Sequence, residues 1–472
     1  MKRVSVWMAS AAASLLAVPA LAADDVDAQL AEMKELVKGL QDKVNAQAEQ
    51  LDQQGKELKE AQRVVRSDEP QSKSALSSFI DSIEVDGGVA ASYNFNFNQP
   101  TDNGPFSTDG FSGGFGQNSG QSGFYMPGHG DANTFQVDQV WFGLGKPATS
   151  ESRAGFRFDI FFGAVASTYA QSIGDRRDNG DSTADYAIDQ AYVEYLAPVA
   201  DIDFKLGKFA TPVGAEVAKQ WSNFNITRGI VYSMLQPVNH MGILATVPLG
   251  SMGEFGAGLV NSGGSTISAP DDGSEKSYLA TLKLGDNRAN IRGTFIYGAE
   301  PTIVNNFSGA PGHSGNQVGL VDATAWFNPS DKVSLWANYD YLFVDETGYY
   351  ANGVAVAGRV QVLPDLGAAV RGEYVRENHS PGHGNLIFTE GGPNGAHDVD
   401  TWSVTGTLDY ALTEHLKLRS EFRWDLANGN GDSTTIGPNG RPVGNNQFAE
   451  NHPGDFSSLD QMVWLIAAEY VF

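Results

Sequence analysis

The chain of 472 residues contains no cysteine. Disulfide bonds, thiolate metal sites and a lipid-modified N-terminal cysteine are therefore excluded. Basic residues are also few, with 31 lysines and arginines against 56 aspartates and glutamates, so the formal net charge is −25. Such a composition argues against nucleic acid as a partner, because that ligand requires a basic surface. Beyond residue 22 no run of about 18 apolar residues occurs, so the sequence predicts no membrane-spanning helix there.

The first 22 residues have the features of a secretory signal peptide. Lys2 and Arg3 precede an apolar segment at 4–18, and the small residues at 20–22 form a cleavage site. Its removal would change the net charge from −25 to −27. A short N-terminal membrane anchor is the alternative, but the apolar segment is short for that role. With 54 glycines and 11% aromatic residues, the exported chain is either a secreted β-protein or an outer-membrane barrel.

Residues 24–69 predict a helical rod. Apolar residues recur there at alternating spacings of four and three, which is typical of a coiled coil. The predicted seam contains Leu30, Met33, Val37, Leu40, Val44, Leu51 and Leu58. A helix with so narrow an apolar stripe requires a partner, and we favour a homotrimer. The alternative is a single helix that lies on the surface of the next domain. Residues 70–83 follow as a linker.

Residues 84–472 predict an all-β domain of sixteen antiparallel strands. The expected strands are 84–97, 133–146, 153–165, 185–198, 201–210, 240–248, 253–261, 275–285, 289–299, 317–328, 332–344, 350–362, 365–377, 398–411, 415–427 and 460–472. The even-numbered connections are tight, whereas the odd-numbered ones are long, apart from the one near 345–349. This asymmetry is typical of a transmembrane β-barrel of the bacterial outer membrane. An even strand number places both termini, and therefore the rod, in the periplasm.

The two faces of the strands support a barrel with an apolar outer surface. In 416–426, for example, a face that is apolar apart from Ser420 alternates with a face of charged residues. The last strand carries Trp464, Ile466, Tyr470 and Phe472 on one face, which we expect to contact lipid while the strand closes the barrel against the first. Aromatic residues near strand ends, Trp141 among them, are expected to form interfacial girdles.

Four segments resemble a known family of outer-membrane channels. They are DQAYVEYLAP (189–198), KLGKFATPVGAE (205–216), WSNFNITRG (221–229) and MGILATVPLG (241–250), and they are similar to the OmpL-like β-barrel porin family. The last strand also resembles the outer-membrane assembly signal of bacterial porins. The resemblance implies a water-filled pore. A rod followed by sixteen strands looks like the phosphate-selective trimeric porins, although the charges of the predicted wall give little support to that substrate.

The polar faces of the strands predict a lumen wall of mixed charge. The charged residues of this wall are Arg157, Asp159, Asp203, Lys205, Lys283, Arg292, Asp340, Arg371, Glu373, Asp409, Lys417, Arg419, Glu421, Arg423 and Asp425. An anion filter would require a ring of arginine or lysine, and this set is nearly balanced. Facing rows of opposite charge would set up a transverse field. The alternative is that many of these residues only form salt bridges within the wall.

The long connection 211–239 is the predicted constriction of the pore. It holds too many apolar residues for a freely solvated loop, so it must fold either into the lumen or against a neighbouring subunit. If it folds inward, we expect Glu216, Lys219, Trp221 and Arg228 to narrow the pore.

Histidines in the long loops raise the alternative of metal capture at the surface. His379, His383 and His397 share one predicted loop, and imidazole is a common ligand of zinc and copper. Their Pro-Gly neighbours are ordinary turn residues, however, so we predict no metal site. The segment 174–182 is similar to a calcium loop but has Arg177 where an oxygen ligand is needed.

No nucleophile elbow, phosphate-binding loop or H-E-x-x-H motif occurs, so the sequence predicts neither an enzyme nor a cofactor. The resulting hypothesis is an outer-membrane porin for passive diffusion of small hydrophilic solutes or ions, embedded in outer-membrane lipid. The alternative is a tether, in which the rod links a filled barrel to the cell wall or to a periplasmic partner. The sequence does not identify a solute.

Overall fold

The computed structural model describes residues 35, 38–39, 79–97, 133–166, 186–261, 276–299, 317–345, 348–378, 398–429 and 458–472. The chain divides into two units, residues 1–82 and 83–472. In the first unit, residues 35, 38, 39 and 79–81 are helical. The expected signal peptide and every residue of the expected coiled-coil seam lie outside the described residues, so both remain predictions. No helix among the described residues is long and apolar enough to cross a membrane.

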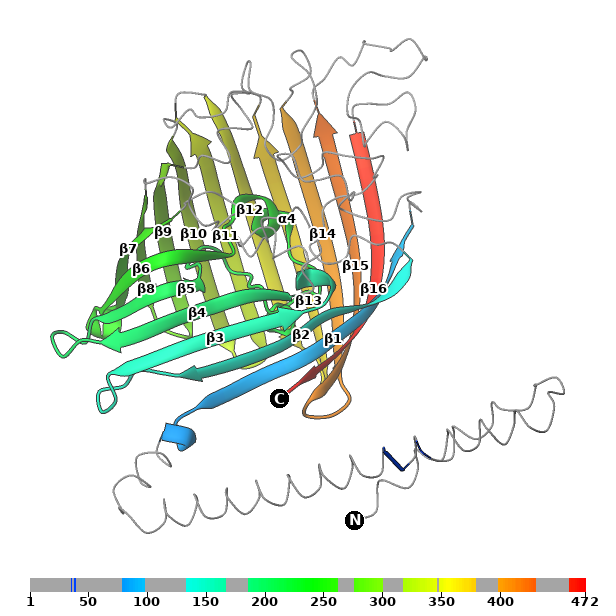
Figure 1. The fold of residues 1–472 in the computed structure, drawn as a ribbon. Coiled ribbons are helices and arrows are strands. Elements are labelled where there is room, and N and C mark those ends of the chain that lie inside the picture. Colours follow the sequence, from blue (N-terminus) through cyan, green and yellow to red (C-terminus); the bar gives the residue numbers. More distant parts are fainter. Residues whose placement is uncertain are drawn as a thin grey trace. The chain divides into compact units, whose positions relative to one another are not determined.

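The second unit is a sheet of sixteen strands that closes into a barrel (Figure 1). The strands are β1 (Glu84–Asn96), β2 (Thr134–Lys146), β3 (Ala154–Phe162), β4 (Tyr186–Leu196), β5 (Asp203–Ala210), β6 (Asn239–Pro248), β7 (Gly253–Val260), β8 (Ser277–Gly285), β9 (Ala289–Ala299), β10 (Gln317–Ser330), β11 (Val333–Val344), β12 (Tyr349–Gln361), β13 (Leu366–Glu377), β14 (Val399–Ala411), β15 (Leu416–Gly429) and β16 (Ser458–Val471). Each strand pairs antiparallel with its neighbours in chain order, and β1 pairs with β16. The predicted sixteen-stranded antiparallel barrel is confirmed.

The last residues of the chain close the barrel. The backbone N–H of Phe472 donates to the carbonyl of Gly87 at 3.0 Å, and the Gly87 N–H donates back at 3.1 Å. Along the same seam Phe95 lies opposite Trp464. Closure leaves no open sheet edge, which satisfies the backbone hydrogen bonds of strands that cross a lipid bilayer.

The faces of the strands follow the expected alternation. On β15 the outward residues Leu418, Phe422 and Trp424 are 39–46% exposed, whereas Arg419 and the other charged residues at alternate positions up to Asp425 are at most 4% exposed. The terminal aromatics Trp464, Tyr470 and Phe472 also point outward and are exposed. On these strands the apolar surface therefore faces outward and the polar surface inward, as predicted.

Trp141 does not lie in an outer girdle, so that prediction is wrong. It is buried and stacks on Phe161, with ring centroids 4.8 Å apart. The cause is a β-bulge in β2: Ala90 pairs with Gln139 while Ala91 pairs with Val137, so the strand register skips the intervening residue, Asp138. One extra residue reverses the faces of the strand, and Trp141 turns from the lipid side to the lumen side.

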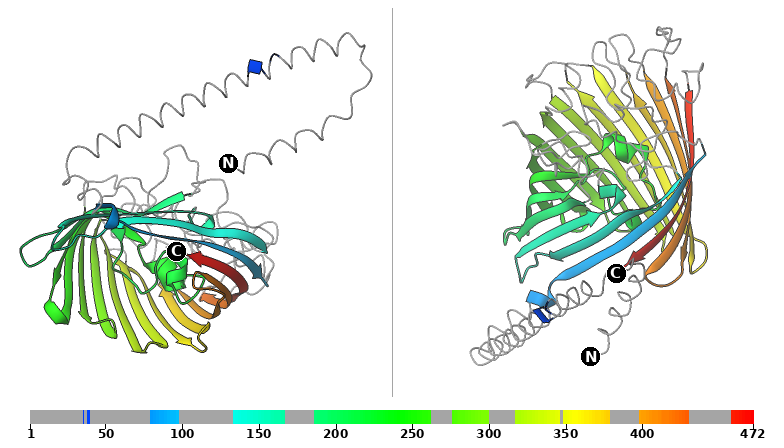
Figure 2. Two further views of the ribbon diagram at one scale, coloured as in Figure 1. Left: turned by 90° about the horizontal axis from the view of Figure 1, so that it is seen from below. Right: turned by 45° about the vertical axis from the view of Figure 1, so that its right-hand side comes forward.

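Tight turns join the strands in pairs, from β2–β3 to β14–β15, at one end of the barrel. In the turn between β8 and β9 the carboxylate of Asp286 accepts hydrogen bonds from the backbone N–H groups of Arg288 at 2.8 Å and Ala289 at 3.0 Å. The Ala289 and Arg288 amides lower the pKa of Asp286 below its ordinary value. The connection between β5 and β6 is different: it is long, fully described and folds inside the ring of strands (Figure 2).

Candidate functional site

The inserted loop, residues 211–238, joins β5 to β6. It contains the 3₁₀ turn η1 (Gln220–Ser222) and the helix α4 (Ile230–Leu235), whose six residues are all buried. Gly229 precedes α4 in an extended conformation, and its carbonyl accepts the Ser233 hydroxyl hydrogen bond at 2.7 Å. The sequence left two positions open for this loop, the lumen or a neighbouring subunit. Its apolar residues and its backbone contact the inner wall of the barrel.

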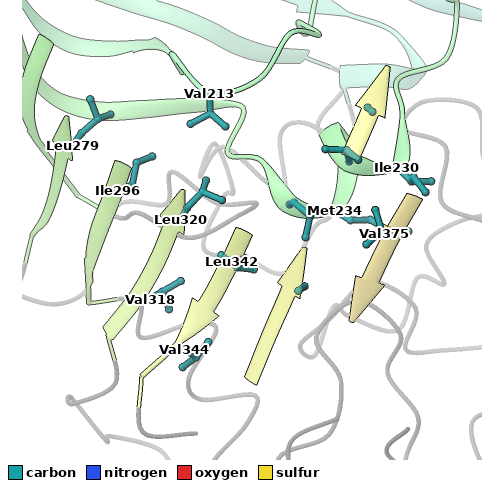
Figure 3. Packing of buried hydrophobic residues seen from close by; sticks show 14 of the residues in the cluster. Val213, Ile230, Met234, Leu279, Ile296, Val318, Leu320, Leu342, Val344 and Val375 are labelled. Atoms are coloured by element: carbon teal, nitrogen blue, oxygen red, sulfur yellow. The ribbon is translucent and has the colours of Figure 1, made fainter. Parts of the chain in front are cut away.

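Apolar residues of the loop pack on the inner surface of β8–β13. Val213 lies near Leu279, Ile296 and Leu320, and Met234 lies beside Val375 (Figure 3). Wall glycines give room for this packing. A Cβ atom at Gly353 on β12 would lie 2.8 Å from Leu235 Cδ1 and 3.0 Å from Val231 Cγ2. The loop therefore fits the wall closely, and its apolar residues are removed from water.

Charged residues of β13 hold the other side of the loop. Arg371 forms an ion pair with the loop carboxylate Glu216, with an N–O distance of 2.5 Å, and donates to the Thr227 carbonyl at 2.7 Å. Glu373 pairs with Arg371 at 3.0 Å and accepts the backbone N–H of Val231, at the start of α4, at 3.1 Å. Burial raises the pKa of Glu216 above its ordinary value, although Arg371 and the Gly229 amide oppose this effect.

Residues of β15 contact the central part of the loop. Glu421 accepts hydrogen bonds from the N–H groups of Ile226 at 2.5 Å and Thr227 at 3.0 Å, and from the Thr227 hydroxyl at 2.6 Å. Arg423 donates to the carbonyl of Arg228 at 2.8 Å and is paired with Asp425 at 2.8 Å.

Arg419 completes this contact and is paired with Glu469 of β16 at 3.1 Å. It donates to the carbonyls of Asn223 at 3.2 Å and Phe224 at 2.5 Å. Six predicted wall residues of β13 and β15 therefore either form hydrogen bonds with the loop backbone or form an ion pair with a residue that does. These residues are Arg371, Glu373, Arg419, Glu421, Arg423 and Asp425.

Of the remaining predicted wall residues on β3 and β5, Arg157, Asp203 and Lys205 are partly accessible and Asp159 is buried. Arg157 is paired with Asp159 at 2.6 Å and with Asp86 of β1 at 2.5 Å. Lys205 lies 3.6 Å from Asp203 and 3.8 Å from Glu194. Asp86 and Glu194 were absent from the predicted set, although both lie on inward faces of the strands to which the sequence assigned them.

The last predicted wall residues are distributed over other strands. On β9, Arg292 donates to the carbonyl of Pro212 at 2.8 Å, and on β8 Lys283 is half-buried. Lys417 lies 4.0 Å from Asp409, whose carboxylate is held by Arg359 at 2.7 Å. The final member of the set, Asp340 of β11, is fully buried beneath the loop.

The predicted constriction residues take different positions. Lys219 points to the wall across the lumen, 2.6 Å from Asp86, and its Nζ lies 5.0 Å from the centre of the Trp141 ring. Trp221 lies against β1, where a Cβ atom at Gly88 would be 2.9 Å from its ring. Arg228 is fully buried and donates to the carbonyl of Ala218. Arg228 and Glu216 are therefore buried within the loop, whereas Lys219 lies on the more exposed side of the loop.

A cavity of about 490 Å³ lies between the first half of the loop and the facing wall. Its charged lining consists of Arg157, Asp159, Asp189, Glu216, Lys219 and Arg292. Its aromatic lining consists of Trp141, Tyr192, Tyr232 and Trp326. Both signs of charge occur on the wall, in Arg157 and Asp159 for example, and on the loop, in Glu216 and Lys219. Such a lining can orient water and small polar solutes.

The histidines considered as metal ligands, His379, His383 and His397, lie outside the described residues, as does the segment 174–182. Within the described part of the chain no group of three or more His, Asp or Glu side chains is arranged to hold a metal ion.

A closed barrel with an apolar outer face, a polar inner face and an inserted loop defines the class of outer-membrane porins. Residues 82–461 match the family described as beta-barrel porin-2, OmpL-like, and the chain belongs to this family. A comparison with curated proteins gave no match.

The chain is similar to several solved structures of outer-membrane proteins. The outer membrane channel DcaP of Acinetobacter baumannii is 12% identical, with a TM-score of 0.48, over 83% of this chain and 97% of that chain. The trimer form of OmpT of Vibrio cholerae is 11% identical, with a TM-score of 0.47, over 83% and 99%. An anion-selective porin from Comamonas acidovorans is 11% identical, with a TM-score of 0.46, over 83% of this chain and 99% of that chain.

Proposed function

We propose that this outer-membrane porin is a passive diffusion channel for small hydrophilic solutes or ions, narrowed by the loop 211–238. The observation that carries the proposal is the polar cavity of about 490 Å³ that remains beside the inserted loop. A lumen filled by side chains would instead favour the tether. The ion pair between Lys219 and Asp86 crosses from loop to wall, so the narrow passage is bounded by both signs of charge.

The test is conductance of the purified full-length protein in a planar lipid bilayer under a salt gradient. We expect stepwise current increases as channels insert, and the reversal potential gives the sign of the preferred ion. Liposome swelling with sugars of increasing size measures the largest solute that passes the narrowest part of the pore. A folded, heat-modifiable barrel that gives neither current steps nor solute-dependent swelling would refute a diffusion channel.

We also propose that residues 24–69 form a periplasmic coiled coil that joins three copies of the chain. The support is the predicted seam from Leu30 to Leu58, which requires partner helices. Chemical cross-linking should give a trimer band for the full chain, and deletion of 24–69 should weaken it while the barrel still folds. A monomer band for the full chain in the same detergent would contradict the trimer.

A further inference from the structure

Two buried carboxylates face each other beneath the inserted loop. Asp322 of β10 and Asp340 of β11 are opposite in the strand register, and both point into the barrel. Their exposed fractions are 1% and 0%. Among the described residues, no ion pair includes either carboxylate. This distinguishes the pair from Glu373 and Asp425, which contact an arginine, and from Glu421, which accepts two loop N–H groups.

Neutral donors surround the pair. The side-chain amide of Asn338 donates to Asp322 at 2.8 Å and to Asp340 at 3.3 Å. The Thr324 hydroxyl donates to Asp322 at 3.1 Å. These groups stabilise a carboxylate, but none of them cancels a second negative charge.

Both ends of the loop 211–238 are bonded to this pair. At the start, the backbone N–H of Gly214 donates to Asp322 at 3.2 Å. At the end, the side-chain amide of Gln236 donates to Asp340 at 2.6 Å and to the Asn338 oxygen at 2.6 Å. Gly214 has a φ of +80°, and a Cβ atom there would collide with the Gln236 side chain, so the two loop ends meet at this point.

The elements packed around the pair supply little positive charge. On β9 the facing groups are Thr294, opposite Asp322, and Arg292, whose guanidinium acts on Asp322 through space while it donates to the Pro212 carbonyl. On β12 the residue opposite Asp340 is Gly353.

Within the described ranges, the neighbouring strands and the loop supply no further cation to the pair. On β10 and β11 the neighbouring inward residues are Thr324 and Asn338. From the loop, the nearest acid in sequence to Gly214 is Glu216, which is bound to Arg371.

Two opposed buried carboxylates cannot both be charged at low cost. We propose that Asp322 and Asp340 share one proton and form a pH-responsive clamp that holds both ends of the inserted loop. Loss of the proton at alkaline pH places two negative charges side by side. Their repulsion moves the carboxylates apart, breaks the bonds to Gly214 and Gln236, and loosens the loop. Only the effect on conductance rests on the proposed channel function.

The shared proton is tested by infrared difference spectroscopy of the folded protein at neutral and alkaline pH. The wild-type protein should lose a protonated-carboxyl band as the pH rises. Asp322→Asn and Asp340→Asn should lack this change, because the remaining carboxylate has no charged neighbour and ionises at lower pH. The matched control Asp203→Asn, whose carboxylate lies near Lys205, should keep it. Heat-modifiable migration confirms that each variant folds. A wild-type spectrum without the band would refute the shared proton.

Loop movement is tested by a spin label at Val217→Cys. Val217 is 45% exposed on the loop, and the chain has no native cysteine, so labelling is specific. We expect label mobility and channel closing events to increase with pH in the wild-type background and to stay constant with Asp340→Asn. If mobility is independent of pH, the clamp is wrong.

Calcium and a chelator separate the proton from a bound cation. If chelation alone mobilises the loop at neutral pH, a cation holds the pair and the shared proton is refuted. If the chelator has no effect and the pH response persists, the clamp is supported. A folded barrel that gives no channel current at any pH refutes the proposed channel. The infrared and spin-label measurements still test the clamp in that case.

Discussion

Replacement of Arg371 by methionine should release the inserted loop from β13. Arg371 is fully buried, and its guanidinium contacts Glu216, Glu373, the Thr227 carbonyl and the Thr405 hydroxyl, at distances of 2.5 to 3.1 Å. Methionine keeps much of the side-chain volume but none of these bonds. The two carboxylates would then stay buried without their cation.

The structure predicts a large cost for this substitution. Removal of one partner from a buried ion pair typically destabilises a protein by about 3–5 kcal/mol, because the remaining charge is uncompensated. Since 1.4 kcal/mol is a factor of about ten, the equilibrium constant of unfolding should rise by roughly a hundred- to a few thousand-fold. An exposed pair would contribute only about 0.2–1 kcal/mol.

The assay is a double-mutant cycle of Arg371→Met, Glu216→Gln and the double variant, measured by urea unfolding in lipid vesicles. Neutralisation of Glu216 removes one uncompensated charge, so the double variant should be more stable than the sum of the single effects predicts, by about 0.5–3 kcal/mol. Single-channel recordings should show a noisier open state for Arg371→Met. A cost below about 1 kcal/mol, or strict additivity, would refute the anchoring argument.

The same variant should have a characteristic pH dependence. Burial raises the pKa of Glu216, so the folded protein binds this proton more tightly than the unfolded chain does. The stabilisation that this bound proton gives to the folded protein is complete when the pH is below the ordinary pKa of a glutamate. It is lost as the pH rises through the pKa of Glu216 in the folded protein. The deficit of Arg371→Met relative to wild type should therefore shrink at mildly acidic pH. A constant deficit would show that the Glu216 charge is not its cause.

Three further outcomes follow from the contacts. Lys219→Met breaks the partly exposed ion pair with Asp86, so the free energy of unfolding should change by less than about 1 kcal/mol. The reversal potential should shift towards cation preference. The control Lys332→Met, at an exposed turn, should leave the reversal potential unchanged. Leu235→Ala leaves a cavity under α4 and should cost about 2–5 kcal/mol in urea unfolding; a cost below about 1 kcal/mol would contradict the packing. Deletion of Phe472 removes its paired bonds to Gly87 and should lower the yield of heat-modifiable folded barrel; an unchanged yield would argue against this seam.

The candidate site was only partly accessible from the sequence. Alternation placed Arg371 and Arg423 on the inner face correctly, because a strand with a lipid-facing side must carry its charges on the other side. Their contacts with the loop join residues far apart in sequence, such as Arg423 with Arg228, and no local pattern encodes such a pair. Glu216 and Lys219 were predicted to narrow the pore because they are charged residues of an otherwise apolar loop, and this role stays a prediction. Asp86, the partner of Lys219, was missed because the two residues are 133 positions apart and no local pattern joins them.

The sequence by itself determined the strand number, the apolar outer face and the closure of the last strand on the first. These features depend on a period of two and on the lengths of connections, which are local properties of the chain. Only the tertiary structure decided that the loop 211–238 enters the lumen and that Trp141 faces inward. Both depend on features that no local pattern encodes. One extra residue in the bulge of β2, Asp138, reverses the faces of that strand, and the loop position is set by the summed contacts of strands that are distant in sequence.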